Sequence, residues 1–296
     1  MFEDHDPDLV TATDRAAYER DGVWFSPVLF GPDEIAHLRA EVQRLYAGER
    51  DFDADRWPGR RDPIPLLPGR MANTINGWWV NAGVRAAVFS PRVAACAATL
   101  MGADRLRLLH DQVMSKQPVD PEAPEDGNVG WHQDYAHWTI TRASRYCTAW
   151  IALQDTDLDN GAVRFVRGSH HWGLMRESAT FGTRDLDTLR ARFGQGRDWE
   201  EVPAVLQAGQ VSFHDGLTMH GSTANRGSAP RQAILVNVMT DDATYDRDGH
   251  PNQISMQFGP WVHHGQRLGD PWFPLLWPPT GSPAEAERGT AVADGV

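Results

Sequence analysis

The sequence has few features of a secreted, membrane-bound or nucleic-acid-binding protein. Its two cysteines, Cys96 and Cys147, lie far apart, which excludes a disulfide framework and a Cys-x-x-Cys zinc motif. Lys116 is the only lysine and the formal net charge is −12, so the surface repels phosphate backbones and anionic lipids. The apolar runs are expected to fall short of the roughly 20 residues of a membrane span, and the acidic N-terminus lacks a signal-peptide pattern. We therefore expect a cytoplasmic protein without nucleic-acid or membrane partners, and its oligomeric state stays unknown.

The chain contains enough hydrophobic residues to form a sizeable core. Hydrophobic residues make up 41% of its 296 residues, with 12 Trp and 11 Phe. Helical patterns dominate the first third, and helices are predicted over residues 13–20, from 31 to at least 45, and over 91–100. A further segment, 182–199, is expected to be partly helical.

From about residue 105 the pattern changes to short β segments separated by Gly, Pro, Asn and Asp. Strands are predicted near residues 105–108 and over 146–153, 162–166, 210–214 and 231–239, after an early one over 23–29. Many short strands of this kind indicate a barrel or jelly roll. We predict one mainly β domain with flanking helices over residues 13–281, a flexible tail over 1–12 and a disordered tail over 282–296.

The segment Trp-His-Gln-Asp at 131–134 carries the first candidate metal ligands. On an extended backbone, His132 and Asp134 point to the same face and can present an imidazole and a carboxylate to one ion. Iron(II) oxygenases combine such a pair with one more histidine and leave the opposite face open for cosubstrate and oxygen. Alone the spacing is weak, because a chain with 12 histidines and many aspartates contains such a pair by chance.

A second segment strengthens this interpretation. His220 lies in Thr-Met-His-Gly-Ser, and Arg231 follows eleven residues later at the start of a predicted strand. A dicarboxylate cosubstrate needs a buried cation, and the planar fork of arginine binds a carboxylate bidentately. Ser222 can add a hydroxyl donor to the same carboxylate. A surface ion pair is the alternative role for Arg231, and we prefer ligand binding because of its strand position.

These motifs resemble those of the phytanoyl-CoA dioxygenase family of 2-oxoglutarate oxygenases. The resemblance covers roughly residues 14–240 and rests on the segments 22–45, 131–134, 146–153, 160–170 and 220–222 and on Arg231. It implies a double-stranded β-helix, the cupin-like jelly roll, with Fe(II) inside one end and with 2-oxoglutarate and O2 as cosubstrates. It also implies site residues: His132, Asp134 and His220 as metal ligands, and Arg231, Ser222, Trp150, Gln112 and Lys116 as contacts of 2-oxoglutarate.

The substrate cannot be read from the sequence. We expect a small specialised metabolite of natural-product biosynthesis, oxidised at an unactivated C–H bond, most simply by hydroxylation; oxidative cyclisation, desaturation and epimerisation remain open. Trp138, His137 and Trp79 are the candidate substrate contacts, and His214 is interpreted as a strand end beside the site. Two alternatives stay open, a zinc hydrolase and a cupin-like metal-binding protein without oxygenase activity.

Overall fold

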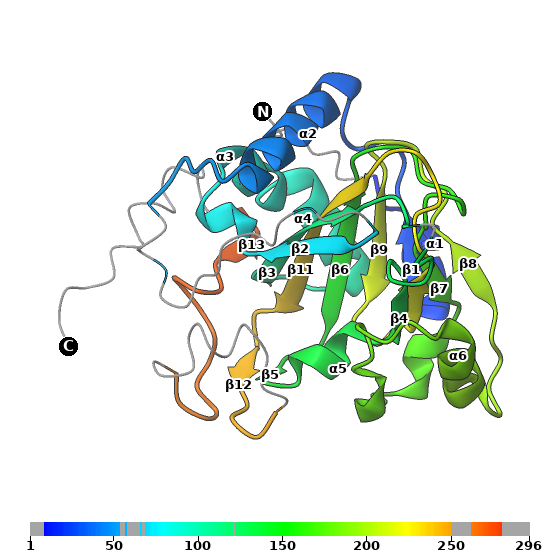
Figure 1. Ribbon diagram of the computed structural model, residues 1–296. Helices are drawn as coiled ribbons and strands as arrows, with labels where there is room; N and C mark the ends of the chain where they lie inside the picture. The colour runs from blue at the N-terminus through cyan, green and yellow to red at the C-terminus, as the bar shows by residue number, and fades with distance from the viewer. Residues whose placement is uncertain are drawn as a thin grey trace.

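The computed structural model describes residues 9–53, 57, 66, 69–120, 122–249 and 262–279, and Figure 1 shows a β-rich body with α2, α3 and α4 gathered on one side of it. Within these residues the helices are α1 (Ala12–Asp21), α2 (Pro32–Tyr46), α3 (Ala82–Val88), α4 (Pro91–Met101), α5 (Asp134–Trp138) and α6 (Leu186–Gly194), with 3-10 turns η1 (Gly77–Trp79), η2 (Ser169–Trp172) and η3 (Arg176–Ser178).

The first helix has clear start and stop signals. Thr11 and Asp14 form a capping box at its N-terminus, and Gly22 ends it in the left-handed region at φ 75°. Val10, just before the cap, is buried in the core. Within the described end of the predicted N-terminal tail, residues 9–12, Val10 thus packs in the core and α1 begins at Ala12. The rest of that tail and the predicted C-terminal tail lie outside the described residues.

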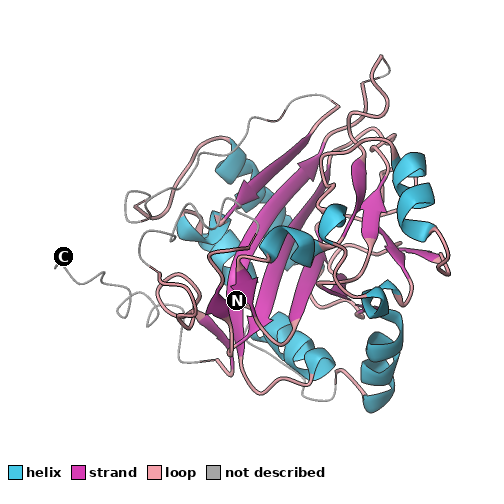
Figure 2. Cartoon of the chain, turned by 90° about the horizontal axis from the view of Figure 1, so that it is seen from below, coloured by secondary structure: helices cyan, strands magenta, loops and turns pink. Residues whose placement is uncertain are grey.

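The strands form two main antiparallel sheets, which confirms the mainly β fold with flanking helices (Figure 2). The larger sheet has the order β1-β9-β6-β11-β3-β13 with β2 beside β3, the smaller sheet has the order β4-β10-β7-β8, and β12 pairs with β5. Their bounds are β1 (Val23–Phe25), β2 (Met71–Ile75), β3 (Leu106–Lys116), β4 (Val129–His132), β5 (Thr141–Arg142), β6 (Tyr146–Ala152), β7 (Arg164–Val166), β8 (Glu201–Pro203), β9 (Val211–Asp215), β10 (His220–Ser222), β11 (Arg231–Thr240), β12 (Thr244–Tyr245) and β13 (Leu275–Trp277).

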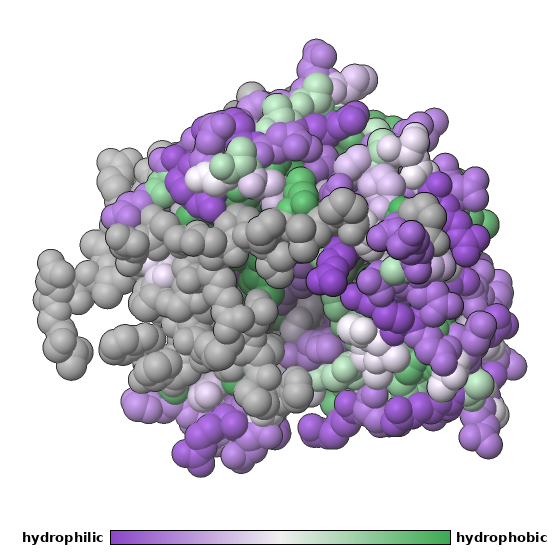
Figure 3. Space-filling model, in the orientation of Figure 1, coloured by the Kyte–Doolittle hydropathy of each residue, from purple (hydrophilic) through white to green (hydrophobic). Residues whose placement is uncertain are grey.

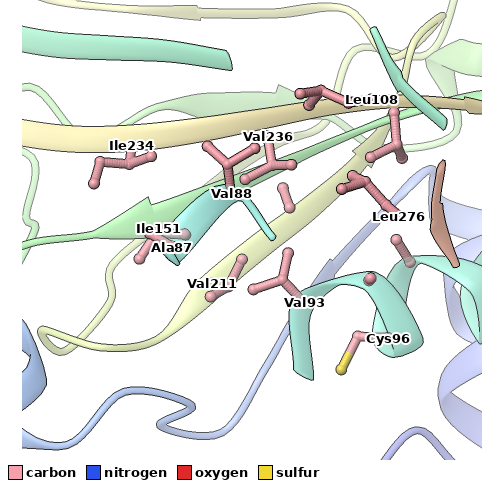
Figure 4. Close-up of a cluster of buried hydrophobic side chains, with 14 of the residues drawn as sticks. Ala87, Val88, Val93, Cys96, Leu108, Ile151, Val211, Ile234, Val236 and Leu276 are labelled. Atoms are coloured by element: carbon pink, nitrogen blue, oxygen red, sulfur yellow. The ribbon is translucent and has the colours of Figure 1, made fainter. Parts of the chain in front are cut away.

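The main core lies between the larger sheet and helices α3 and α4. Figure 4 shows Val88 of α3 and Val93 of α4 packed towards Ile151 and Val236 of the sheet. The opposite face of the larger sheet is turned to the smaller sheet, so residues that alternate with the core residues, such as Trp150, line a cavity there. The coloured part of the surface in Figure 3 carries mostly hydrophilic residues.

One expectation about membrane spans is wrong. The stretch Ala82–Met101 is 20 residues long with a mean hydropathy of 1.2, so it reaches the length and composition of a span. It consists of two helices, α3 and α4, which are interrupted between Val88 and Pro91. Residues of both helices pack in the main core, and 67% of the most apolar window is buried inside the protein, so packing against the larger sheet accounts for its apolar character.

A β-bulge in β3 determines which of its residues face the cavity. Asn237 of β11 lies opposite His110, but the next residue, Val238, lies opposite Leu108, so β3 contains one extra residue, Leu109. Leu108 therefore packs in the main core, whereas His110 and the residues alternating after it line the cavity. Strict alternation of side chains along β3 would put Leu108 and His110 on the same face of the sheet, and the bulge makes that prediction wrong.

Candidate active site

Local backbone structure brings His132 and Asp134 to one face. β4 ends at His132, Gln133 keeps an extended backbone at φ −102° and ψ 132°, and α5 begins at Asp134. The two side chains thus keep the spacing predicted for an extended segment, although Asp134 lies in the first turn of a helix. β10 pairs with β4 in an antiparallel register that sets His220 directly opposite His132, which adds a second imidazole.

The three side chains point their ligand atoms at a common position. Oδ1 of Asp134 lies 3.5 Å from Nε2 of His132 and 3.6 Å from Nε2 of His220, and all three ligand atoms lie within 4.8 Å of one another. Nδ1 of His132 donates to the carbonyl of Gly130 at 2.7 Å, and Nδ1 of His220 donates to that of Thr218 at 2.9 Å. These bonds fix the tautomer in which Nε2 carries the lone pair. The donor set, two imidazole nitrogens and one carboxylate oxygen, fits iron(II).

The electrostatics favour the protonation states that a metal requires. Burial opposes ionisation of Asp134, but the interactions with His220, His132 and His214 outweigh burial and hold the pKa of its carboxyl well below the usual range. Burial, together with the neighbouring His132, lowers the pKa of His220 well below its ordinary value. An ionised carboxylate and a neutral imidazole are the forms that bind a metal ion.

A cavity of about 220 Å³ lies between the two sheets, and the three ligand candidates are in its wall. The same wall contains Gln112 of β3, Trp150 of β6 and Ser222 of β10, which were expected to contact the cosubstrate, as well as Arg231. A cavity of this kind, largely apolar with a few convergent polar groups, is typical of small-molecule sites.

Two buried basic side chains lie beside each other here: Arg231, which is in the cavity wall, and Lys116, which is not among its lining residues. They lie opposite each other in the β3–β11 register and are 3% and 0% exposed. Nζ of Lys116 donates to Oγ of Ser222 and to the carbonyl of Thr223, both at 2.6 Å. Nε and Nη1 of Arg231 have no hydrogen-bond partner among the described residues, and its guanidinium lies 5.1 Å from the ring centre of Trp150.

These two cations lack an anionic partner in the described part of the chain. Burial lowers the pKa of Arg231 to about 10, and burial together with Arg231 lowers that of Lys116 well below its ordinary value. Burying an unpaired charge costs several kcal/mol, so such a site is retained where an anion supplies the missing partner. The distal carboxylate of a dicarboxylate can supply this missing partner, because the N–H groups of a guanidinium bind a carboxylate oxygen by charge-assisted hydrogen bonds.

The candidate substrate contacts divide into two groups. His137 and Trp138 lie on α5 and line the cavity. Trp79 does not, and its assignment is corrected here: it is 2% exposed on η1 and packs in the main core, stacked on Trp57 with ring centres 4.6 Å apart. Its position in η1, which packs against α3, directs the indole into the helix-covered core. His214 lines the cavity too. Its Nε2 lies 3.1 Å from Oδ2 of Asp134, whereas the two proposed histidine ligands face Oδ1.

The structure adds cavity residues that sequence reasoning missed. Met71, Asn73 and Ile75 alternate along β2, a strand that was not predicted, and His110 joins them through the bulge in β3. Phe181 lies in the segment before α6 and packs its ring edge against His132 at 5.1 Å between ring centres. The sequence Met-Ala-Asn-Thr-Ile carries no clear apolar alternation, and the bulge in β3 has no sequence signal either, so both were missed.

Comparisons with known proteins give a family match and several similar enzymes. The family model described as Phytanoyl-CoA dioxygenase (PhyH) matches residues 18–233. The ectoine dioxygenase of Bordetella parapertussis is 26% identical over 249 residues, which are 77% of this chain and 75% of that protein. The peroxisomal phytanoyl-CoA dioxygenase of Mus musculus is 22% identical over 252 residues, covering 80% and 70%.

Two solved structures have the same fold over nearly the whole chain. The non-haem α-ketoglutarate-dependent epimerase SnoN from nogalamycin biosynthesis has a TM-score of 0.71 and 25% identity, covering 92% of this chain and 99% of that one. The non-haem α-ketoglutarate-dependent carbocyclase SnoK from the same biosynthesis has a TM-score of 0.69 and 24% identity, covering 91% and 97%. The predicted jelly roll is thereby confirmed.

Proposed function

The chain belongs to the phytanoyl-CoA dioxygenase family and is a non-haem iron, 2-oxoglutarate-dependent dioxygenase; from this premise we propose that it oxidises an unactivated C–H bond of a small specialised metabolite. Hydroxylation is the outcome we expect. Ring closure, desaturation and epimerisation start from the same substrate radical, so they belong to the same proposal. Family membership removes the zinc hydrolase and the metal-binding protein without oxygenase activity as alternatives.

We propose that His132, Asp134 and His220 bind the iron. The observation that carries this assignment is the convergence of two Nε2 atoms and one carboxylate oxygen within 4.8 Å, in the wall of a cavity that also contains Arg231. Iron(II) with 2-oxoglutarate supplies O2 activation for breaking a C–H bond, and 2-oxoglutarate is converted to succinate and CO2. The backbone carbonyls behind both imidazoles keep their Nε2 atoms aimed at the metal position.

The other cavity residues bind and orient the two organic ligands. Arg231 receives the distal carboxylate of 2-oxoglutarate through its guanidinium, on which two nitrogens have no partner among the described residues, and Trp150 supports the guanidinium with its ring face. Lys116 holds the hydroxyl of Ser222 in place through the hydrogen bond from its Nζ. His137 and Trp138 are proposed to contact the substrate, because α5 carries them away from Asp134 along the cavity wall.

Three observations support a small metabolite as the substrate. The similar proteins named above include an ectoine dioxygenase and two enzymes of nogalamycin biosynthesis, all of which act on small molecules. The cavity, of about 220 Å³, is small and lies between the two sheets. The only lysine, Lys116, is buried and already donates to Ser222 and Thr223, so it offers nothing to the phosphates of an acyl-CoA.

Substrate-dependent release of succinate tests this proposal. Iron-loaded protein with 2-oxoglutarate should form succinate faster when a true small-molecule substrate is added. The product should show the mass of a hydroxylated, cyclised or desaturated molecule, or the unchanged mass and altered chromatographic retention of an epimer. Arg231→Leu is the matched control, because it removes the cosubstrate contact and leaves the three iron ligands in place. Stimulation by acyl-CoA thioesters but by none of a broad panel of small metabolites would contradict the proposed substrate class.

A further inference from the structure

Four polar side chains form a row across the larger sheet, on the face that lines the cavity. His110 of β3 lies opposite Asn237 of β11, Asn237 opposite Thr148 of β6, and Thr148 opposite His214 of β9. All four are at most 2% exposed. Buried polar groups in the middle of a sheet are unfavourable unless they have hydrogen-bond partners. The stability of the row therefore depends on the groups to which these four side chains bind.

The partner of two of these side chains is the carboxylate of Asp134. Oγ1 of Thr148 donates to Oδ2 at 2.7 Å, and Nε2 of His214 lies 3.1 Å from the same oxygen. The other oxygen, Oδ1, faces Nε2 of His132 and of His220. The two carboxylate oxygens are thus divided: Oδ1 points at the metal position, and Oδ2 is held by the sheet.

The hydrogen-bonding capacity of these groups sets the direction of each bond. Thr148 has one hydroxyl proton and two neighbouring side chains, Asp134 through Oδ2 and the amide of Asn237 at 2.8 Å. The ionised carboxylate is the stronger acceptor and takes the proton, so the amide of Asn237 must donate to Oγ1 through its Nδ2, which has no other partner among the described residues. A carboxylate oxygen has no proton to give, so Nε2 of His214 is the donor there, and its Nδ1 is left as an acceptor without a partner among the described residues.

We propose that Thr148 and His214 are positioning residues that act as a clamp on Oδ2 of Asp134 and restrict this carboxylate to ligation through Oδ1 alone. A carboxylate that is free to turn can bind a metal with both oxygens and occupy one more coordination position. On a bound ion, a second carboxylate oxygen would take a position that would otherwise stay open for the cosubstrate or O2. This inference rests on the proposed function, because it requires Asp134 to be a metal ligand.

Cobalt(II) binding tests the clamp without turnover. Thr148→Val removes the hydroxyl at nearly constant volume, and His214→Phe removes the donor and keeps a ring beside Phe165, whose centre lies 4.9 Å from that of His214. Each should raise the Kd for cobalt(II) by about 10- to 100-fold, the usual effect of losing a residue that orients a metal ligand. Each should also change the cobalt(II) visible absorption spectrum, which reports coordination number.

Two further variants separate positioning from folding. Thr148→Ser keeps the hydroxyl and should restore the affinity and spectrum of the wild type. Ser212→Ala is the matched control on β9, because Ser212 is buried two residues before His214 and its Oγ has no partner in the described part of the chain. It should bind cobalt(II) as the wild type does. Thermal unfolding of each metal-free variant identifies any that do not fold. If Thr148→Val or His214→Phe fails to fold, the cobalt(II) affinity of the other variant decides whether the clamp exists.

Asp134→Ala makes the possible failures distinguishable. If this variant binds cobalt(II) as tightly as the wild type, Asp134 is not a ligand and the proposed metal site itself fails. If Asp134→Ala loses binding but folded Thr148→Val or His214→Phe keeps the wild-type Kd and spectrum, the metal site stands and the clamp is overturned.

Discussion

Replacing Arg231 with leucine removes the cation that we propose binds the distal carboxylate of 2-oxoglutarate. Arg231 is 3% exposed, and its Nε and Nη1 have no partner among the described residues, so both are available to the cosubstrate. A hydrogen bond to a charged group contributes about 1.5–3 kcal/mol, which corresponds to a rise of roughly ten- to a hundred-fold in the Kd for 2-oxoglutarate. Ser222→Ala removes a neutral donor worth about 0.5–1.5 kcal/mol, and the Kd should rise only about two- to ten-fold.

The assay is a calorimetric titration of cobalt-loaded protein with 2-oxoglutarate, in which no turnover occurs. Cobalt affinity should be unchanged in both variants, because neither residue is a proposed ligand. Metal-free Arg231→Leu should unfold at the same or a higher temperature than the wild type, since it removes a buried cation that lies opposite Lys116. An unchanged Kd for 2-oxoglutarate in Arg231→Leu would place the carboxylate elsewhere and refute the reasoning.

Three further predictions concern the cavity and its surroundings. Burial lowers the pKa of His110 from 6.5 to about 4. Between pH 6.5 and about pH 4, His110 is therefore protonated in the unfolded chain but neutral in the native protein. The unfolding free energy of the metal-free protein should fall by about 3 kcal/mol as the pH drops through that window, and His110→Gln should lose this contribution in denaturant titrations. Trp138→Ala should weaken substrate binding and leave the Kd for 2-oxoglutarate unchanged. Trp79→Ala should lower the unfolding free energy by about 3–5 kcal/mol and leave substrate binding unchanged. Weaker substrate binding in a stable Trp79→Ala variant would return Trp79 to the substrate site. Turnover in excess chloride should give no halogenated main product by mass spectrometry, because the carboxylate of Asp134 occupies the position that chloride would need; a halogenated main product would reject Asp134 as a ligand.

The segments that carry the site were predictable because their spacing reflects local backbone geometry. His132 and Asp134 are two residues apart on an extended backbone, and this holds even though α5 begins at Asp134. His220 and Arg231 belong to β10 and β11, and the strand register carries them to the same cavity. Helices α1, α2 and α4 were predictable for the same reason, since caps and apolar stripes are local signals.

What the sequence could not predict depends on contacts between distant strands. His110 faces the cavity only because Leu109 forms a bulge against β11. No residue in this segment is of a type that predicts such a bulge. Thr148 looks like an ordinary strand residue until the register brings it beside His214 and Asp134. Trp79 was assigned to the substrate pocket from its aromatic character alone, which does not distinguish a pocket wall from a packed core.

Metal stoichiometry tests the central claim most directly. Purified protein should bind one iron(II) per chain. Binding should be retained in His137→Ala, which removes a cavity residue outside the ligand set, and lost in each of the three ligand variants, His132→Ala, Asp134→Ala and His220→Ala. Full iron stoichiometry in any two of these three variants would contradict the assignment of the metal site.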